Sequence, residues 1–234
     1  MLRRLAGLLR RLDQPGKAER RFVFIVTYGR SGSTVLQNIL GSIPSSHMTG
    51  ENLDVLGGMF RSWLSAVQAK AEQGSSPRKA PGDPWRGVHL IDPERFNRRQ
   101  AEIFIDEILQ PPPGAKLIGF KEVRYFDYDE ELPAYLDYIR MTFTPALLVF
   151  NRRRGADVAK SGWWRQNPAG IAAKVTAFDA ITGAYAKAHP DETIILDYDL
   201  WKKEPEALRP LFDRLGADFD TAAVQRILDV KLKH

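Results

Sequence analysis

Short apolar runs alternate with longer amphipathic segments along the chain. Four runs, residues 22–26, 116–120, 146–150 and 193–196, are rich in β-branched or aromatic residues. Such runs are typical of strands buried on both faces of a parallel sheet. The alternation with helices predicts an α/β fold, a P-loop-like three-layer arrangement with helices flanking a central parallel sheet. The predicted helices begin near Val35 and cover residues 93–110, 130–140, 156–164, 171–188, 206–215 and 222–228.

The length and the loop composition predict one main domain. A chain of 234 residues can bury one sizeable core, so we assign residues 21–234 to a single domain after an N-terminal segment, residues 1–20. Residues 71–92 are rich in Gly, Pro, Ser and charge, which predicts a polar surface insertion. Two interpretations stay open for it: a lid or acceptor-binding loop, or a tolerated surface insertion.

The N-terminal segment has a helical pattern of its own. Leu2, Leu5, Leu9 and Leu12 fall on one helical face, and four arginines lie elsewhere. A helix packed on the domain and peripheral contact of residues 1–12 with an anionic membrane surface both fit this pattern. There is no secretory cleavage site and no run near the ~18 apolar residues of a membrane span. We therefore expect a cytoplasmic protein.

The composition limits which partners, nucleophiles and metal sites the chain can have. The net charge of +5 suits an enzyme that handles polyanionic cofactors, and by itself it does not predict a nucleic-acid partner. The chain has no cysteine, which excludes disulfides, a thiolate nucleophile and cysteine-ligated metal. Its four histidines form no convincing cluster of metal ligands, so no metal is expected. The oligomeric state is not predicted.

Residues 27–34 form the strongest local signal, and we call them the anion loop. They lie between a buried strand and a helix, where backbone N–H groups and the positive helix end attract an anion. Two glycines permit close backbone approach, three hydroxyls add donors, and one arginine adds a forked cation. This composition predicts a phosphate or sulfate site. Its residues are Gly29, Arg30, Ser31, Gly32, Ser33 and Thr34.

Basic residues also follow two later strands. Lys121 and Arg124 follow the second run, and three arginines, residues 152–154, follow the third. Ser161 stands eight positions after Arg153 on the helix predicted over residues 156–164. In open parallel sheets, ligands bind beyond the carboxyl ends of the strands, so these cations are expected near the anion loop.

These features together resemble the sulfotransferases that depend on 3′-phosphoadenosine 5′-phosphosulfate (PAPS). Residues 29–34 are similar to the 5′-phosphosulfate loop of that family. Arg153 and Ser161 have the spacing of its 3′-phosphate site. Residues 198–200, followed by 204–216, are similar to a segment near its C-terminus. Three features in the family's order make the resemblance more specific than one loop would.

The resemblance implies a donor, a product and site residues. PAPS would be the co-substrate, PAP the product, and a hydroxyl the acceptor. Arginine at position 30, where cytosolic members commonly carry lysine, is similar to the bacterial and Golgi-type branches, which act on carbohydrate or protein acceptors. Gly50-Glu51 is similar to the glutamate base of the bacterial and tyrosine-directed branches. The implied catalytic residues are Arg30, Glu51 and Lys121. The implied cofactor-binding residues are Arg30, Ser31, Gly32, Ser33, Thr34, Arg153 and Ser161.

Several alternatives stay open. A P-loop kinase would carry lysine directly after the second glycine, but Ser33 follows Gly32 here. A non-catalytic PAP- or nucleotide-binding protein is the other alternative. Glu51 could be a solvated loop residue, and Lys121 could form a salt bridge with Glu122 or another carboxylate. Any of the three arginines could bind the 3′-phosphate. A carbohydrate or glycoconjugate hydroxyl is the favoured acceptor, beside a phenol or a peptide tyrosine.

Overall fold

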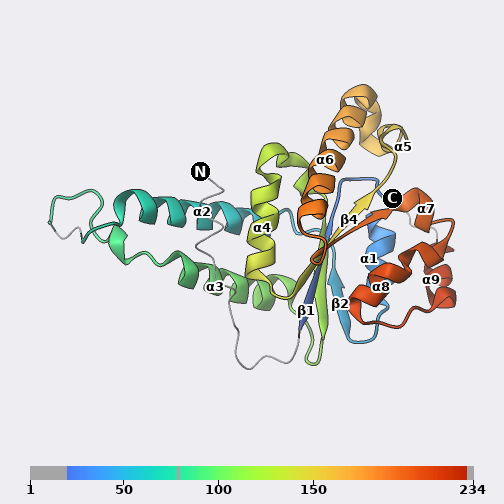
Figure 1. The fold of residues 1–234 in the computed structure, drawn as a ribbon, viewed down its shortest axis with the longest axis horizontal. Coiled ribbons are helices and arrows are strands. Elements are labelled where there is room, and N and C mark those ends of the chain that lie inside the picture. The colour runs from blue at the N-terminus through green and yellow to red at the C-terminus, as the bar shows by residue number, and fades with distance from the viewer. Residues whose placement is uncertain (1–19, 78–79, 231–234) are drawn as a thin grey trace.

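The protein is described by a computed structural model over residues 20–77 and 80–230. Its centre is a five-stranded sheet in the order β2-β3-β1-β4-β5, and every pairing is parallel (Figure 1). The prediction of an α/β fold with a central parallel sheet is therefore confirmed. The strands are β1 (Arg21–Val26), β2 (Ser46–Thr49), β3 (Leu117–Glu122), β4 (Ala146–Arg152) and β5 (Thr193–Asp197).

The strand register brings the functional segments to one edge. Val26, the last residue of β1, pairs with Glu122 on β3 and with Phe150 on β4. Because all strands are parallel, their carboxyl ends meet at the same edge of the sheet. Each of the five strands therefore delivers the residues that follow it to this edge.

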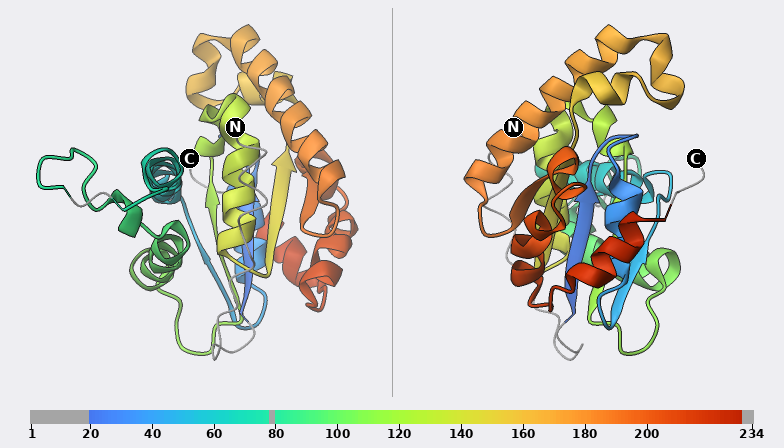
Figure 2. Two further views of the ribbon diagram at one scale, coloured as in Figure 1. Left: turned by 60° about the vertical axis from the view of Figure 1, so that its left-hand side comes forward. Right: turned by 90° about the vertical axis from the view of Figure 1, so that its right-hand side faces the viewer.

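Helices cover both faces of the sheet (Figures 1 and 2). Alternate residues of β1 explain this: Phe22, Phe24 and Val26 join one core cluster, and Val23 and Ile25 join the other. The first cluster is covered by α2 (Val55–Gln73), α3 (Pro93–Ile103), α4 (Leu132–Thr142) and α6 (Pro168–Ala188). The second is covered by α1 (Ser33–Gly41), α7 (Tyr198–Trp201), α8 (Arg209–Leu215) and α9 (Thr221–Leu228).

Shorter helical segments complete the chain. A π-helix continues α3, and α5 follows β4 beneath the start of α6 (Figure 1). Several single-turn 3₁₀ segments connect the larger elements. Their bounds are Phe104–Leu109 for the π-helix, Gly155–Ala159 for α5, and Val88–Leu90, Arg124–Asp127, Asp129–Glu131, Gly162–Gln166 and Pro205–Leu208 for the 3₁₀ segments.

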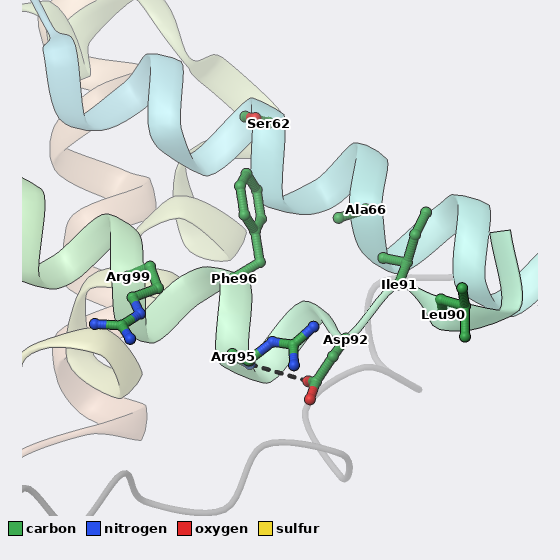
Figure 3. A pocket seen from close by; sticks show the side chains of 8 residues that line it. All are labelled: Ser62, Ala66, Leu90, Ile91, Asp92, Arg95, Phe96 and Arg99. Carbon is green, nitrogen blue, oxygen red and sulfur yellow. Dashed lines mark hydrogen bonds between the residues drawn. The ribbon is translucent and has the colours of Figure 1, made fainter. Parts of the chain in front are cut away.

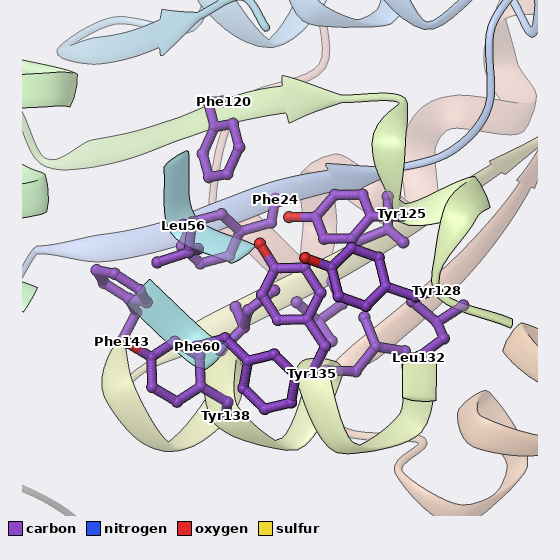
Figure 4. Packing of buried hydrophobic residues seen from close by; sticks show 14 of the residues in the cluster. Phe24, Leu56, Phe60, Phe120, Tyr125, Tyr128, Leu132, Tyr135, Tyr138 and Phe143 are labelled. Atoms are coloured by element: carbon purple, nitrogen blue, oxygen red, sulfur yellow. The ribbon is translucent and has the colours of Figure 1, made fainter. Parts of the chain in front are cut away.

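An aromatic cluster fixes the start of α2 against α4. The ring of Phe60 stacks on that of Tyr135 with centroids 5.0 Å apart, and Tyr128 lies 4.6 Å from Tyr135 (Figure 4). Both tyrosine hydroxyls donate to Asp54, directly before α2, at 2.6 and 3.1 Å. Buried aromatic packing with satisfied hydroxyls holds this helix start in one position.

Three elements differ from the sequence prediction, because β2 and α2 were not predicted and one predicted helix is wrong. Strand β2 was missed because its four half-buried residues, SHMT, form no apolar run at the edge of the sheet. The helix predicted over residues 156–164 is wrong, because α5 ends at Ala159 and a 3₁₀ segment begins at Gly162. Gly162 adopts a φ of 59°, in the left-handed region that interrupts a helix. Ser161 therefore lies between two helical segments rather than on one.

Other predictions concern the outer parts of the chain. Residues 71–73 of the predicted polar insertion belong to α2. The amphipathic pattern of residues 1–12 lies outside the described residues. None of the helices in the described parts of the chain is long and apolar enough to cross a membrane.

Candidate active site

The carboxyl edge of the sheet gathers residues from all five strands. The order across the sheet is Glu51 after β2, Lys121 in β3, the anion loop after β1, Arg153 after β4 and Asp199 after β5. The basic and acidic residues that the sequence places far apart thus line one edge. The anion loop lies at its centre, because β1 is the central strand.

Buried hydrogen bonds fix the anion loop to the end of β4. The Thr27 hydroxyl lies 2.7 Å from the Ser31 hydroxyl and 2.7 Å from the backbone oxygen of Asn151. The Asn151 side chain donates to the Ser31 carbonyl at 2.9 Å and accepts from Trp201 Nε1 at 3.0 Å. These side chains are inaccessible to water apart from a trace at Trp201, so the loop conformation is set before any ligand binds.

The loop leads into a helix start that is ready for an anion. Arg30 and Gly32 have φ values of 68° and 80°, in the left-handed region. The first turn of α1 has no side-chain cap and no acidic residue. Its unpaired N–H groups and the positive end of the helix dipole therefore remain available to an anionic ligand.

Gly32 is also required by close packing. A Cβ at this position would lie 2.1 Å from the ring of Tyr198, at the start of α7. No larger residue fits there without moving the ring. Tyr198 thereby ties the segment after β5 to the anion loop.

Arg153 and Ser161 both contact Arg30 of the anion loop. Arg153 Nη1 donates to the Arg30 carbonyl oxygen at 2.8 Å, and Arg30 Nε donates to Ser161 Oγ at 2.8 Å. The Tyr28 hydroxyl bridges the backbone of Arg153, donating to its oxygen at 2.8 Å and accepting from its nitrogen at 2.9 Å. Arg30 thus contacts both Arg153 and Ser161, which stands 131 positions later in the chain.

The three consecutive arginines have different surroundings. Arg152 donates to the Asp179 carbonyl and to Thr182 Oγ1 on α6, at 2.6 and 2.8 Å. Arg153 faces the anion loop, and its buried Nε makes no hydrogen bond. Arg154 is the most exposed, with 72% of its side chain accessible. The geometry therefore separates one arginine that packs on α6, one that faces the loop and one that faces solvent.

Residues after β5 support Arg153 from the other side. Its guanidinium lies 5.0 Å from the centre of the Tyr198 ring, a cation–π distance. Asp199 Oδ1 lies 3.8 Å from Arg153 Nε, and Asp199 Oδ2 lies 3.3 Å from Arg154 Nε. The Tyr-Asp pair at the start of α7 thus orients both arginines.

Glu51 and Lys121 form an ion pair at the other end of the edge. Lys121 Nζ lies 2.5 Å from Glu51 Oε1, and Arg124 Nη1 lies 3.4 Å from Glu51 Oε2. Lys121 is nearly buried, whereas about a third of Glu51 and of Arg124 is exposed. The alternative in which Lys121 forms a salt bridge with a carboxylate is therefore found, with Glu51 as the partner; Glu122 pairs instead with Arg124 at 3.0 Å.

Burial and charge shift the pKa of two groups near the edge. Burial raises the pKa of Asp179 to about 6, against an opposing effect of Arg152. Burial alone would lower the pKa of Arg124, but the hydrogen bonds and charges of Glu122 and Glu51 raise it above its usual value. Arg124 is thus a permanent cation beside Glu51.

Comparison with known proteins identifies the family. A profile of the sulfotransferase family matches residues 23–221, which include every residue of the edge described above. The chain belongs to the sulfotransferase family. A solved structure with the same fold is the sulfotransferase domain from the Synechococcus PCC 7002 olefin synthase. It is 21% identical, with a TM-score of 0.57, and the match covers 95% of this chain and 82% of that one.

A further relative is much longer than this chain. An uncharacterized protein of Aquifex aeolicus (strain VF5) is 25% identical over 213 residues. The match covers 85% of this chain but only 26% of that protein, so the chain spans about a quarter of its length. The sequence prediction of a sulfotransferase is confirmed at the level of the family.

The site residues present fit an adenine nucleotide with two anionic ends. Beside the anion-ready start of α1, the buried Nε of Arg153 is an orphaned donor, and Ser161 lies next to it through Arg30. The hydrogen-bond donors at the start of α1 suit a 5′-phosphosulfate, and those of Arg153 and Ser161 suit a 3′-phosphate. No group of three or more metal-ligating side chains occurs among residues 20–77 and 80–230.

Sequence reasoning missed several residues that organise this sulfotransferase site. Tyr28, Asn151 and Asp199 hold the anion loop and Arg153, and Glu122 holds the loop that carries Glu51. A signal existed for Asn151 and Glu122, since each is a polar residue at the end of a buried apolar strand. Their partners come from distant segments and could not be read from the pattern.

An apolar groove lies away from the edge, between α2 and α3. These helices run side by side away from the sheet (Figure 1). Two adjoining cavities of about 610 and 630 Å³ share the residues Leu90, Ile91 and Asp92. Figure 3 shows Phe96 reaching from α3 toward α2, with Arg95 and Arg99 beside it. The groove is separate from the residues predicted to bind the donor or transfer the group.

Proposed function

We propose that this sulfotransferase uses PAPS as its donor and transfers the sulfuryl group to an acceptor hydroxyl. The observation that carries the proposal is the meeting of Arg30, Arg153 and Ser161 at the end of the anion loop. The 3′-phosphate distinguishes PAPS from ordinary adenine nucleotides. A second anion site beside the first is what recognition of that group requires.

The donor-binding residues divide between the two anionic ends. Backbone N–H groups at the start of α1 would bind the 5′-phosphate, with the hydroxyls of Ser33 and Thr34. The predicted contact of the Ser31 side chain is not proposed, because that side chain is fully buried against Thr27 and supports the loop from behind. Arg153 and Ser161 would bind the 3′-phosphate. Their bonds to the Arg30 backbone and side chain place them next to the loop. Arg30 would lie between the 5′-phosphate and the sulfuryl oxygens.

Transfer needs a base and a way to neutralise moving charge. When bound, the donor supplies an activated sulfuryl group: the acceptor oxygen–sulfur bond forms as the bond from sulfur to the phosphate oxygen of PAP breaks. Glu51 accepts the acceptor proton. Lys121 and Arg30 neutralise charge around the transferring group, while Lys121 also holds the Glu51 carboxylate in place.

The acceptor class follows from the sequence resemblance. We propose a carbohydrate or glycoconjugate hydroxyl, which the arginine in the anion loop, the Gly50-Glu51 segment and the polar insertion together favour. The partly exposed side chain of Glu51 supports access by a bulky acceptor. Since the relative named above belongs to an olefin synthase, an acceptor panel should also include aliphatic alcohols beside sugars and phenols.

Calorimetry and a transfer assay test the proposal together. PAP should bind at least tenfold more tightly than ATP or GTP. Radiolabelled sulfate should then move from PAPS to at least one acceptor in the panel. Tighter binding of ATP would favour a kinase. PAP binding without transfer to any acceptor would favour a non-catalytic binding protein.

A further inference from the structure

Glu122 is a charged side chain that is completely buried at the end of β3. Its Oε2 accepts from the backbone N–H groups of Asn52 and Asp54, at 3.3 and 3.0 Å. Its Oε1 accepts from the backbone of Val123 and Arg124 at 2.9 and 3.1 Å, and from Arg124 Nη1 at 3.0 Å. Four backbone donors and one cation compensate the cost of burying this carboxylate.

These bonds connect two segments that carry the proposed transfer chemistry. One is residues 51–54 after β2, which we call the base segment. The other is the turn after β3, which carries Arg124, with Lys121 directly before Glu122 in the strand. Both cations that pair with the Glu51 carboxylate come from this second segment. Lys121 Nζ lies 2.5 Å from Glu51 Oε1, and Arg124 Nη1 lies 3.4 Å from Glu51 Oε2. The distance between Glu51 and its two cations therefore depends on the Glu122 connection.

The base segment has an unfavourable backbone conformation that needs such support. Leu53 and Asp54 are consecutive non-glycine residues with φ values of 59° and 60°. Left-handed conformations at such residues cost free energy and persist where surrounding contacts impose them. The Asp54 side chain is held by Tyr128 and Tyr135, and its backbone N–H is held by Glu122. The side chain of Leu53 is exposed, so packing of that side chain does not impose the conformation.

We infer that Glu122 is a positioning residue, which holds the base segment so that the Glu51 carboxylate lies beside Lys121 and Arg124. The inference rests on the proposed role of Glu51 as the base. Among the described residues, no hydrogen bond joins Glu122 to the anion loop or to Arg153. We therefore expect Glu122 to affect the rate of sulfuryl transfer and not the affinity for PAPS.

A kinetic comparison separates positioning from general stability. Glu122→Gln keeps the side-chain shape but replaces one carboxylate oxygen with an NH₂ group, which cannot accept from the backbone N–H groups. We expect kcat to fall at least tenfold, with the KM for PAPS and the dissociation constant of PAP within twofold of the native values. Thr142→Val is the matched control, because it breaks the buried pair with Asn97 far from the edge. It should lower Tm and leave kcat within twofold.

A structural measurement keeps the inference testable if transfer is not observed. Hydrogen–deuterium exchange of a peptide covering residues 51–55 should be at least tenfold faster in Glu122→Gln, with no change in residues 29–34. Unchanged exchange in the base segment, or an unchanged kcat, would overturn the inference. A parallel loss of PAP affinity would also overturn it. Absence of transfer by the native protein would instead contradict the proposed function, with the exchange result standing on its own.

A second variant applies if Glu122→Gln does not fold. Leu53→Gly relieves the left-handed backbone and loosens the base segment without removing a core side chain. We expect a lower kcat with an unchanged or higher Tm. Leu53→Asn is its control, because asparagine tolerates the left-handed region and keeps a side chain. Equal kcat in both variants and the native protein would count against a positioned base segment.

Discussion

The two halves of the carboxyl edge are built differently. The donor half consists of the anion loop and the ends of β4 and β5, where Thr27, Ser31 and Asn151 are inaccessible to water. The base half consists of Glu51, Lys121 and Arg124, and 36% of the side chain of both Glu51 and Arg124 is exposed. Neutral buried hydrogen bonds hold the first half, and ion pairs at an open edge dominate the second.

This difference has a functional interpretation. In the proposed function the donor is always PAPS, and binding one fixed molecule favours a site whose geometry is set before the ligand binds. In the proposed function, the open edge leaves room for the acceptor beside Glu51. Lys121 connects the halves, because it lies in the strand next to β1 and holds Glu51. Four predictions test the comparison.

The largest effect is expected at the base. Glu51→Gln removes the proton acceptor, and loss of a general base costs about 10²- to 10⁴-fold in rate. We expect kcat to fall within this range, with PAP binding unchanged. Glu130→Gln, at an exposed position, is the control. Full transfer activity in Glu51→Gln would exclude Glu51 as the base.

The next effect concerns stability in the donor half. Asn151→Ala leaves the Ser31 carbonyl and Trp201 Nε1 without their partner. Each buried unpaired group costs about 1–3 kcal/mol, so we expect the free energy of unfolding to fall by about 3 kcal/mol. Urea unfolding measures it. Glu130→Ala, at an exposed position outside both halves, is the control and should change stability by less than about 0.5 kcal/mol; an equal loss in that variant would contradict the assignment of the loss to Asn151.

Donor affinity should depend on one of the three arginines. Arg153→Ala removes a charge-assisted contact worth about 1.5–3 kcal/mol, so PAP should bind about 10- to 100-fold more weakly. Arg30→Ala should also weaken binding. Arg154→Ala is the matched neighbour, since it is mostly exposed, and we expect less than a threefold change. A larger effect at Arg154 would reassign the 3′-phosphate site. Calorimetry measures all three variants.

The smallest effect concerns pH and Asp179, beside Arg152 on the donor side. Burial raises its pKa from 3.8 to about 6, so in this interval the folded protein binds a proton that the unfolded chain has lost. The free energy of unfolding therefore decreases as pH rises from about 4 to 6. The shift corresponds to at most about 3 kcal/mol, which partial exposure reduces to about 1 kcal/mol.

Asp179→Asn removes this titration. Its free energy of unfolding should fall less than that of the native protein as pH rises from about 4 to 7, by about 1 kcal/mol. Urea unfolding at several pH values measures the difference. Parallel pH profiles of the two proteins would show that Asp179 does not titrate in this interval.

The sequence predicted the parts of the molecule that local pattern determines. The four apolar strands and the loop from Gly29 to Thr34 were placed correctly, because burial on both faces and glycine-rich turns leave clear signals. The short polar strand β2 left none. The break at Gly162 was missed as well, because a single glycine within an amphipathic pattern does not decide whether a helix ends.

The sequence predicted the residues of the site but not the contacts that hold them in place. Arg30, Glu51, Lys121, Arg153 and Ser161 were all selected from the sequence, and the structure brings them to one edge. Which residues hold them depends on contacts across more than 100 positions, such as Tyr28 with Arg153. Local propensity contains no information about such pairs. The family and the sheet order, together, were needed to place them.

Calorimetry with PAP and AMP tests the central claim most directly. The two ligands differ only in the 3′-phosphate, which the account assigns to Arg153 and Ser161. The native protein should bind PAP at least 30-fold more tightly than AMP, and Arg153→Ala should reduce that preference to less than threefold. Equal binding of PAP and AMP by the native protein, or a preference that survives Arg153→Ala, would contradict the account.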